Sequence, residues 1–260
     1  MNHNLNEFIA FANHLSDESE KIIKQYFRKS IYIENKEDES PVTIADKETE
    51  LKIRDLISNR YPNHGILGEE FKGKDIESEY LWVIDPIDGT RSFIAGHKDF
   101  GTLIALLHNK KPIIGIINCP IHKERWLGVH GQQTTMNGHK VSTSNKKTLD
   151  QSYLSSTGLY MFKNDNFKKS FEQIIKKTRY HRFGGDCYNY GMVASGYIEI
   201  VIENMLKLHD YMALIPIIEG AGGKITDKYG KMINFDSDGS VVVSANEQLH
   251  TQLIDIINIY

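Results

Sequence analysis

The stretch from Leu81 to Thr90 constrains this chain most, because it joins a strand-like apolar run directly to a turn that carries two carboxylates. Leu-Trp-Val-Ile is a short apolar run typical of a buried strand. The Asp-Pro pair that follows stops such a run, and the Asp-Gly pair after it is typical of a tight turn. We therefore expect a strand that ends at Asp85-Pro86, with Asp85 and Asp88 held near the edge of a sheet.

Two carboxylates three residues apart on a turn suit a hard cation. Mg²⁺ prefers oxygen ligands and keeps several waters that a substrate phosphate can replace. Asp85 and Asp88 supply carboxylates, and the carbonyl of Ile87 could add a neutral ligand. Gly89 lets the backbone approach a bound group closely, so that the amides of Gly89 and Thr90 can hold an anionic oxygen. Asp-Pro and Asp-Gly are also ordinary turn formers whose side chains cap local amides, and the turn alone does not separate the two interpretations.

Two more acidic positions follow apolar segments. Glu69 lies in Gly-Glu-Glu after the apolar step Ile66-Leu67, and Asp210 follows His209 and precedes a run of apolar residues at helical spacing. Taken singly, Glu69 is consistent with a solvated loop and Asp210 with a plain helix N-cap. Both could equally complete a metal site that faces the turn at residues 85–90.

The rest of the chain predicts alternating layers of helices and sheets. The expected elements are helices over 5–26 and from Thr43 to Tyr61, strands over 100–107, 112–118 and 125–129, a hairpin at Asn137-Gly138, and beyond residue 150 strands near 153, 198–202 and 241–243 with helices over 167–177, 192–196, from Asp210, and through 249–256. We expect an N-terminal α+β half over 1–150 and a C-terminal α/β half over 151–260, packed intimately as one α/β (α+β) unit.

Composition narrows the class of protein. The 260 residues carry a formal net charge of −3, so no broad basic field is expected and nucleic acid is not a predicted partner. No apolar run approaches the roughly 20 residues of a membrane span. Cys119 and Cys187 are too few for a disulfide framework. These features predict a cytoplasmic protein that does not insert into membranes.

The acidic motifs occur together in an order that resembles the inositol monophosphatase family. The resemblance extends from about Pro41 to Asp227 and rests on Gly68-Glu69-Glu70, Trp82 to Thr90, His209-Asp210 and Glu219 to Gly223. It implies a layered αβαβα sandwich and a homodimer. It also implies Mg²⁺-dependent hydrolysis of a phosphate monoester on a small metabolite, with two or three metal ions per active site.

The family's metal ligands can be assigned to matching positions in this chain. The resemblance implies that Glu69, Asp85 and the Ile87 carbonyl bind one Mg²⁺, and that Asp85, Asp88 and Asp210 bind a second. Asp46 matches a position near a third, weaker metal, and its alternative role is a surface aspartate at a helix start. Thr90 would pair with a carboxylate to orient the attacking water, so the implied catalytic residues are Glu69, Thr90 and Asp46.

Further motifs resemble the histidinol-phosphate phosphatase branch of this family. They lie at residues 88–96, 100–107, 124–126 and 182–188. This likeness implies release of histidinol and phosphate from histidinol phosphate in histidine synthesis. The alternatives are an inositol or sugar monophosphatase, which shares the metal machinery, and a binding protein that retains the fold without catalysis.

The same likeness suggests which residues contact the substrate. We expect Asp186, Arg182 and Glu203 at the alcohol end, and Asp88, Gly89, Thr90 and Asp210 around the phosphate. An extra carboxylate at Asp186 would suit a cationic alcohol. The plain alternatives are an ion pair for Arg182, a helix cap for Asp186 and a loop carboxylate for Glu203.

His209 departs from the family pattern, in which tryptophan usually precedes the metal-binding aspartate. A histidine there replaces a bulky apolar wall with a smaller, titratable side chain. We expect His209 to be a packing substitute rather than a catalyst. The substitution changes a wall that bears on the choice of substrate.

Overall fold

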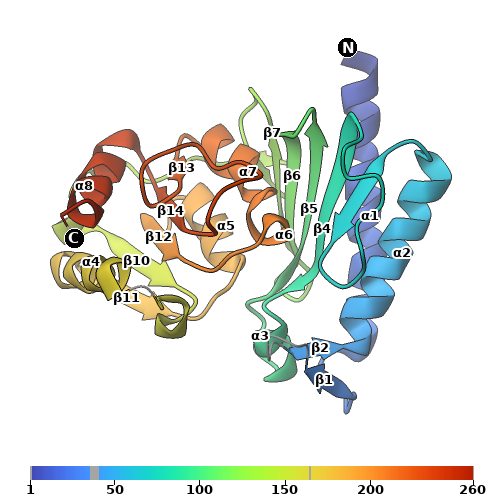
Figure 1. Ribbon diagram of the computed structural model, residues 1–260, viewed down its shortest axis with the longest axis horizontal. Helices are drawn as coiled ribbons and strands as arrows, with labels where there is room; N and C mark the ends of the chain where they lie inside the picture. The colour runs from blue at the N-terminus through green and yellow to red at the C-terminus, as the bar shows by residue number, and fades with distance from the viewer. Residues whose placement is uncertain (1, 36–40, 164, 260) are drawn as a thin grey trace.

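The computed structural model describes residues 2–35, 41–163 and 165–259. Over these residues the elements form five layers, with two helices on one outer face, a large sheet, a helical layer, a smaller sheet and two helices on the other outer face (Figure 1). The predicted αβαβα sandwich is therefore confirmed. No helix in this part of the chain is long and apolar enough to cross a membrane.

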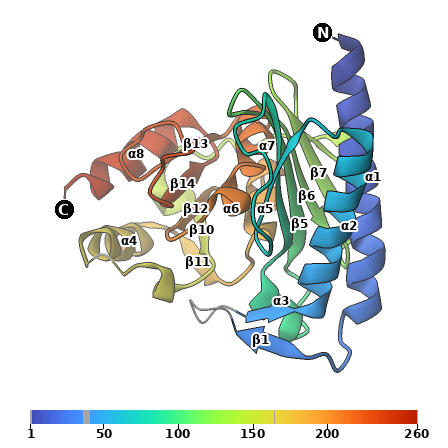
Figure 2. The same ribbon diagram turned by 45° about the vertical axis from the view of Figure 1, so that its right-hand side comes forward.

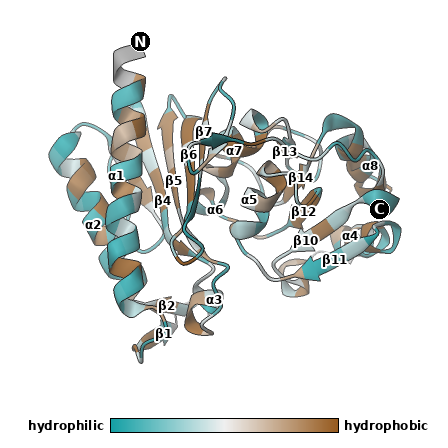
Figure 3. Ribbon diagram, turned by 180° about the vertical axis from the view of Figure 1, so that it is seen from behind, coloured by the Kyte–Doolittle hydropathy of each residue, from teal (hydrophilic) through white to brown (hydrophobic). Residues whose placement is uncertain are grey.

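The first outer layer pairs α1 (Asn2–Tyr26) with α2 (Ile44–Arg60). Thr43 caps α2 as predicted, since its side chain accepts a hydrogen bond from the Ala45 amide at 3.1 Å. Buried side chains of both helices, such as Leu15 and Ile53, pack against Trp82 of the large sheet. The remaining face of α1 is polar, and Figure 3 shows hydrophilic and hydrophobic segments alternating along it.

The large sheet has seven strands in the described residues, in the order β3-β4-β5-β6-β7-β8-β9. They are β3 (Gly65–Gly68), β4 (Tyr80–Asp88), β5 (Gly101–His108), β6 (Lys111–Cys119), β7 (Glu124–Val129), β8 (Thr135–Met136) and β9 (His139–Lys140). Among the described strand pairs of this sheet, β3–β4 is parallel and the others are antiparallel. The predicted hairpin at Asn137-Gly138 is confirmed, with both residues at positive φ.

Strand β4 corrects the prediction that the strand ends at Asp85-Pro86. The strand continues to Asp88, with an irregularity between Asp85, which opposes Leu103, and Asp88, which opposes Gly101. Three steps along β4 thus match two steps along β5. Residues three apart normally point to opposite faces of a strand, and the one extra residue brings Asp85 and Asp88 to the same face. The short helix α3 (Thr90–Ile94) follows directly.

The smaller sheet has five strands in the described part of the chain, in the order β11-β10-β12-β14-β13 (Figure 2). They are β10 (Tyr153–Ser156), β11 (Tyr180–Phe183), β12 (Ile200–Glu203), β13 (Lys224–Thr226) and β14 (Val241–Ser244). Helices α4 (Asp165–Lys177) and α8 (Glu247–Ile257) cover its outer face. The described residues also form the β1–β2 ribbon (Ile33–Asn35 with Pro41–Thr43) and the 3-10 turns η1 (Leu149–Gln151) and η2 (Leu159–Met161).

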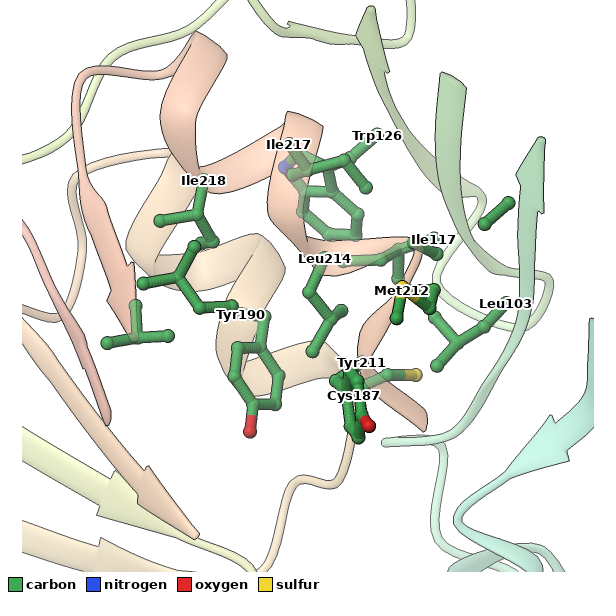
Figure 4. Packing of buried hydrophobic residues seen from close by; sticks show 14 of the residues in the cluster. Leu103, Ile117, Trp126, Cys187, Tyr190, Tyr211, Met212, Leu214, Ile217 and Ile218 are labelled. Atoms are coloured by element: carbon green, nitrogen blue, oxygen red, sulfur yellow. The ribbon is translucent and has the colours of Figure 1, made fainter. Parts of the chain in front are cut away.

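The middle helical layer contains α5 (Tyr188–Ala194), α6 (Leu208–Tyr211) and α7 (Leu214–Gly220). Its side chains form one apolar cluster with both sheets, and Figure 4 shows Ile217 beside Trp126 of β7, with Tyr190 and Leu214 in the same cluster. Helix α7 touches the large sheet at the backbone. A Cβ added at Gly115 would lie 2.0 Å from the carbonyl oxygen of Ala213, which leaves no room for a side chain.

The start of α6 also differs from the prediction. Asp210 does not open a helix, because Lys207 is the N-cap and Asp210 lies within the first turn. The Asp210 carboxylate Oδ2 accepts a hydrogen bond from the Lys207 amide at 2.6 Å. The alternative that Asp210 is a plain N-cap is therefore wrong, although its carboxylate still stabilises the helix start.

Candidate metal centre

Asp85 lies at the middle of the predicted site and is 1% exposed. Its Oδ1 atom has no hydrogen-bond partner among the described residues. A buried, unpaired carboxylate oxygen is costly unless a cation or a proton compensates it. Burial raises the pKa of Asp85 well above its ordinary value, and the neighbouring carboxylates of Glu69, Asp88 and Asp210 raise it further.

Two overlapping groups of possible ligands share Asp85. One contains Glu69, Asp85 and His209, and the other contains Asp85, Asp88 and Asp210, with the ligand atoms of each group within 4.8 Å of one another. The second group is the set that the sequence assigned to one ion. The first group contains Glu69 and Asp85, two of the three ligands predicted for the other ion. The third ligand predicted for that ion, the Ile87 carbonyl, accepts a hydrogen bond from the Thr90 hydroxyl at 3.1 Å.

These residues fit divalent cations on chemical grounds. Several acids converge on a buried place, and burial together with the Asp186, Asp210 and Glu203 carboxylates raises the pKa of Asp88 well above its ordinary value. The acids therefore cannot all ionise without a counter-charge. Hard dications prefer oxygen ligands, and the carboxylate oxygens here surround the unpaired Oδ1 of Asp85.

Asp46 and Thr90 are directly linked. The Thr90 hydroxyl lies 3.2 Å from Asp46 Oδ1, and Asp46 Oδ2 accepts hydrogen bonds from the Thr43 amide and hydroxyl. Asp46 is fully buried, so the alternative of a surface aspartate is wrong. Burial raises its pKa to about 6, and the nearby Glu69 contributes in the same direction.

Glu50, which the sequence analysis did not single out, holds the turn that carries Glu69. This buried carboxylate of α2 accepts hydrogen bonds from the amides of Glu70 at 2.7 Å and Phe71 at 3.3 Å, and it pairs with Arg54. Gly68 is required beside it, because an added Cβ would lie 2.0 Å from Glu50 Oε1. Helical spacing gave no signal for Glu50, since its partners lie about twenty residues away.

Gly89 and Asp186 bring the two halves of the chain together at the site. Gly89 has a φ of 91°, and an added Cβ would lie 2.9 Å from the Asp186 carboxylate. The Ser92 hydroxyl donates to Asp186 Oδ2 at 2.7 Å, and the Cys187 amide donates to Asp88. Asp186 does not cap α5, for which Cys187 is the N-cap position, so that alternative is wrong.

A cavity of about 460 Å³ opens beside these groups. The predicted site residues that line it are Glu69, Asp88, Gly89, Thr90, Asp186, Glu203 and Asp210, together with His209. Burial raises the pKa of Asp186 above its ordinary value, and the charge of Asp99 adds to this effect. The cavity wall is therefore acidic beyond the metal centre itself, although Arg91, Lys163 and Lys207 also border it.

Glu203 ends β12 and is 2% exposed, so it is not a loop carboxylate. It accepts hydrogen bonds from the Thr157 amide and hydroxyl and from the Tyr190 hydroxyl. Burial raises its pKa to about 7 despite these bonds.

Arg182 lies outside the cavity. Its side chain, on β11, is 56% exposed and pairs with Asp99 Oδ2 at 2.9 Å. The ion-pair alternative describes its position in the structure, and the contact with substrate stays a prediction.

The sequence model described as the inositol monophosphatase family matches residues 4–260. The bifunctional phosphatase IMPL2, chloroplastic, of Arabidopsis thaliana is 43% identical over 96% of this chain and 75% of its own length. A histidinol-phosphatase of Chlorobaculum parvum is 34% identical over 96% of each chain. The solved structure of an inositol monophosphatase from Zymomonas mobilis is 39% identical, covers 97% of this chain and 98% of that chain, and superposes with a TM-score of 0.88.

Proposed function

This chain belongs to the inositol monophosphatase family of phosphatases, and on that premise we propose that it hydrolyses histidinol phosphate with the help of Mg²⁺. The observation that carries the proposal is the pair of overlapping ligand groups that share Asp85. Oxygen-rich groups of this kind, beside a cavity, suit phosphate ester hydrolysis.

Glu69, Asp85 and the Ile87 carbonyl would hold one cation, and Asp85, Asp88 and Asp210 a second. Asp46 lies where a third could contact it. Bound cations would supply Lewis acidity and neutralise charge on the phosphate. The amides of Gly89 and Thr90 would hold a phosphate oxygen, and the open cavity beside them leaves room for the ester.

The chain's own residues would orient the attacking water. The one hydroxyl hydrogen of Thr90 can reach either the Ile87 carbonyl or Asp46 Oδ1. With the Ile87 carbonyl on a cation the hydrogen would go to Asp46, which turns the oxygen lone pairs of Thr90 toward the cavity. A water that donates to Thr90 and to Glu69 would then point its own lone pair at phosphorus. Attack would be in line with the leaving alcohol, without a phosphoenzyme.

The acidic wall supports a cationic alcohol. Asp186 borders the cavity close to Asp88, and Glu203 adds a second carboxylate. Both carboxylate oxygens of Glu203 accept hydrogen bonds, from Thr157 and Tyr190, whereas Ser92 donates to Oδ2 of Asp186. Asp186 is therefore the better candidate partner for an amine. A histidinol-phosphatase of Mycobacterium tuberculosis, which is 29% identical to this chain, favours the same substrate.

Inositol phosphate is the competing substrate, because an inositol-1-monophosphatase of Bacillus subtilis is 30% identical over 90% of this chain. The test compares kcat/KM for L-histidinol phosphate and myo-inositol 1-phosphate with Mg²⁺ in parallel. We expect a preference of at least about a hundredfold for histidinol phosphate, since a charged partner discriminates strongly. Equal rates, or a preference for inositol phosphate, would contradict the substrate assignment while leaving the metal chemistry in place.

Two variants sharpen this test. Asp186→Asn keeps the shape of the side chain and removes its charge, so it should erode the preference mainly through a higher KM for histidinol phosphate. Arg182→Gln is the matched control, because Arg182 lies on β11, just before the connection that carries Asp186, but outside the cavity. A retained preference in Asp186→Asn would remove Asp186 from the substrate site.

The homodimer and the cytoplasmic location stay predictions of the sequence.

A further inference from the structure

His209 lies within one of the two ligand groups. The side chain is buried, and one of its ring nitrogens lies within 4.8 Å of carboxylate oxygens of both Glu69 and Asp85. Its Nε2 atom is also 3.4 Å from Asp210 Oδ1. The ring therefore borders carboxylates of both groups, a position that the expectation of a packing substitute did not include.

The spacing is compatible with direct ligation. Ligand atoms about 2.1 Å from a shared cation are about 3.0 Å apart when adjacent and about 4.2 Å apart when opposite. The Glu69, Asp85 and His209 atoms all lie within 4.8 Å of one another, so any excess over the larger value is one that small side-chain rotations can close. The unpartnered Oδ1 of Asp85 is an independent sign that a ligand belongs at this place.

The geometry points to His209 as a nitrogen ligand of the cation held by Glu69 and Asp85, which biases this position toward a transition-metal dication such as Co²⁺ or Zn²⁺ over Mg²⁺. The inference rests on the metal centre of the proposed function. Imidazole nitrogen suits the later first-row dications, whereas Mg²⁺ prefers oxygen donors. A position with two carboxylates, the Ile87 carbonyl and one imidazole thus differs in selectivity from the Asp85, Asp88 and Asp210 group, which contains only oxygen donors.

The short helix α6 places His209 next to a predicted metal ligand, Asp210. His209 and Asp210 are adjacent on α6, which contacts β4, the strand of Asp85 and Asp88. The same short helix can therefore present an oxygen donor to one group and a nitrogen donor to the other. An apolar side chain at residue 209 could fill the volume but could not supply a donor.

The first test titrates the full-length, metal-free protein with Co²⁺ and with Mg²⁺ by calorimetry. In His209→Asn and His209→Phe, we expect Co²⁺ affinity to fall by at least about tenfold and Mg²⁺ affinity to change by less than about threefold, since even outer partners of metal ligands carry about tenfold effects. The visible spectrum of bound Co²⁺ should shift in both variants. His108→Gln is the control, because His108 pairs with Glu79 away from the site. Unchanged Co²⁺ affinity and spectrum in both His209 variants would overturn the inference.

The second test needs no variant. Crystals of the wild-type protein soaked in Zn²⁺ would show anomalous peaks, and a peak about 2.0–2.1 Å from a His209 ring nitrogen would support the inference. Peaks held by carboxylates alone, or no peak beside His209, would overturn it. Failure of the proposed function looks different, since it would appear as no Mg²⁺-dependent phosphatase activity on either phosphate ester.

Discussion

At the scale of single residues, the site is defined by how its carboxylates share one buried place. Asp85 belongs to both ligand groups and keeps an oxygen without a partner among the described residues. Burial raises the pKa of Asp85 and Asp88 before any neighbour contributes. The acids are thus held in a state that favours protons or dications over free ionisation.

Asp88→Asn should abolish turnover while the protein stays folded. The amide keeps the size of the side chain but removes a charged ligand. Loss of a residue that only hydrogen-bonds to a metal ligand costs about 10–100-fold, so we expect kcat to fall by more than about a hundredfold. Phosphate release and thermal unfolding of the same preparation check this. Asp55→Asn on the exposed face of α2 is the control. Normal Mg²⁺-dependent activity in the Asp88 variant would refute the ligand assignment.

At the scale of elements, junctions between strands and neighbouring helices aim the ligands. The extra residue in β4 turns Asp85 and Asp88 to one face. The buried Glu50 of α2 receives the amides of the turn after β3 and so positions Glu69. Helix α2 therefore contributes to the site twice, through Asp46 at its start and Glu50 one turn later.

Gly68→Ala tests the junction between α2 and β3. The new methyl group would collide with Glu50 Oε1, which cannot move without losing hydrogen bonds to the turn. We expect a loss of about 1–3 kcal/mol in the free energy of unfolding, as for other overpacked sites, and a larger proportional loss of kcat. Denaturant unfolding and steady-state kinetics provide the two readouts.

The matched control for that variant is Gly138→Asn in the hairpin, where an added Cβ meets nothing within 4 Å and the positive φ suits asparagine. It should leave both quantities almost unchanged. If Gly68→Ala behaved like this control, Glu50 would not constrain the turn.

At the scale of the whole molecule, the cavity is assembled by both sheets and the helical layer between them. Glu69 and Thr90 come from the large sheet and its connections, whereas Asp186 and Glu203 come from the smaller sheet and its connections. A continuous apolar cluster holds the two sheets together. Because this cluster fixes how the layers face one another, acids from distant parts of the chain meet in one cavity.

This concentration of acids predicts how pH and metal affect stability. The pKa values of Asp46 and Glu203 rise to about 6 and about 7, from ordinary values of 3.8 and 4.5. Between the ordinary and the raised values the folded, metal-free protein binds more protons than the unfolded chain. The free energy of unfolding should therefore fall as pH rises from about 4 to about 7.

Mg²⁺ should oppose that trend, because the proposed metal centre would bind it through ionised carboxylates. We expect the increase in Tm on adding Mg²⁺ to be larger at about pH 8 than at about pH 5. Thermal scans in EDTA and in excess Mg²⁺ across this range measure it. Glu203→Gln should flatten the pH dependence in EDTA, and a Tm in EDTA that rose with pH in the wild-type protein would contradict the assignment of these shifts.

The sequence by itself determined the features that neighbouring residues encode. The cap at Thr43, the hairpin at Asn137-Gly138 and the layered pattern of helices and strands followed from local propensities and spacing, and the structure confirms them. The acid-rich turn after an apolar strand suited a hard cation but was equally consistent with an ordinary turn, and the metal site was assigned from the order of the acidic motifs and the family resemblance.

Only the tertiary structure decided which distant side chains meet. The extra residue in β4, the buried support from Glu50, the exposed ion pair of Arg182 and the place of His209 among the ligands all depend on packing between elements far apart in the chain. Sequence spacing describes one strand or helix at a time. It cannot give the register and orientation between layers, and these decide which donor atoms come within reach of the same ion.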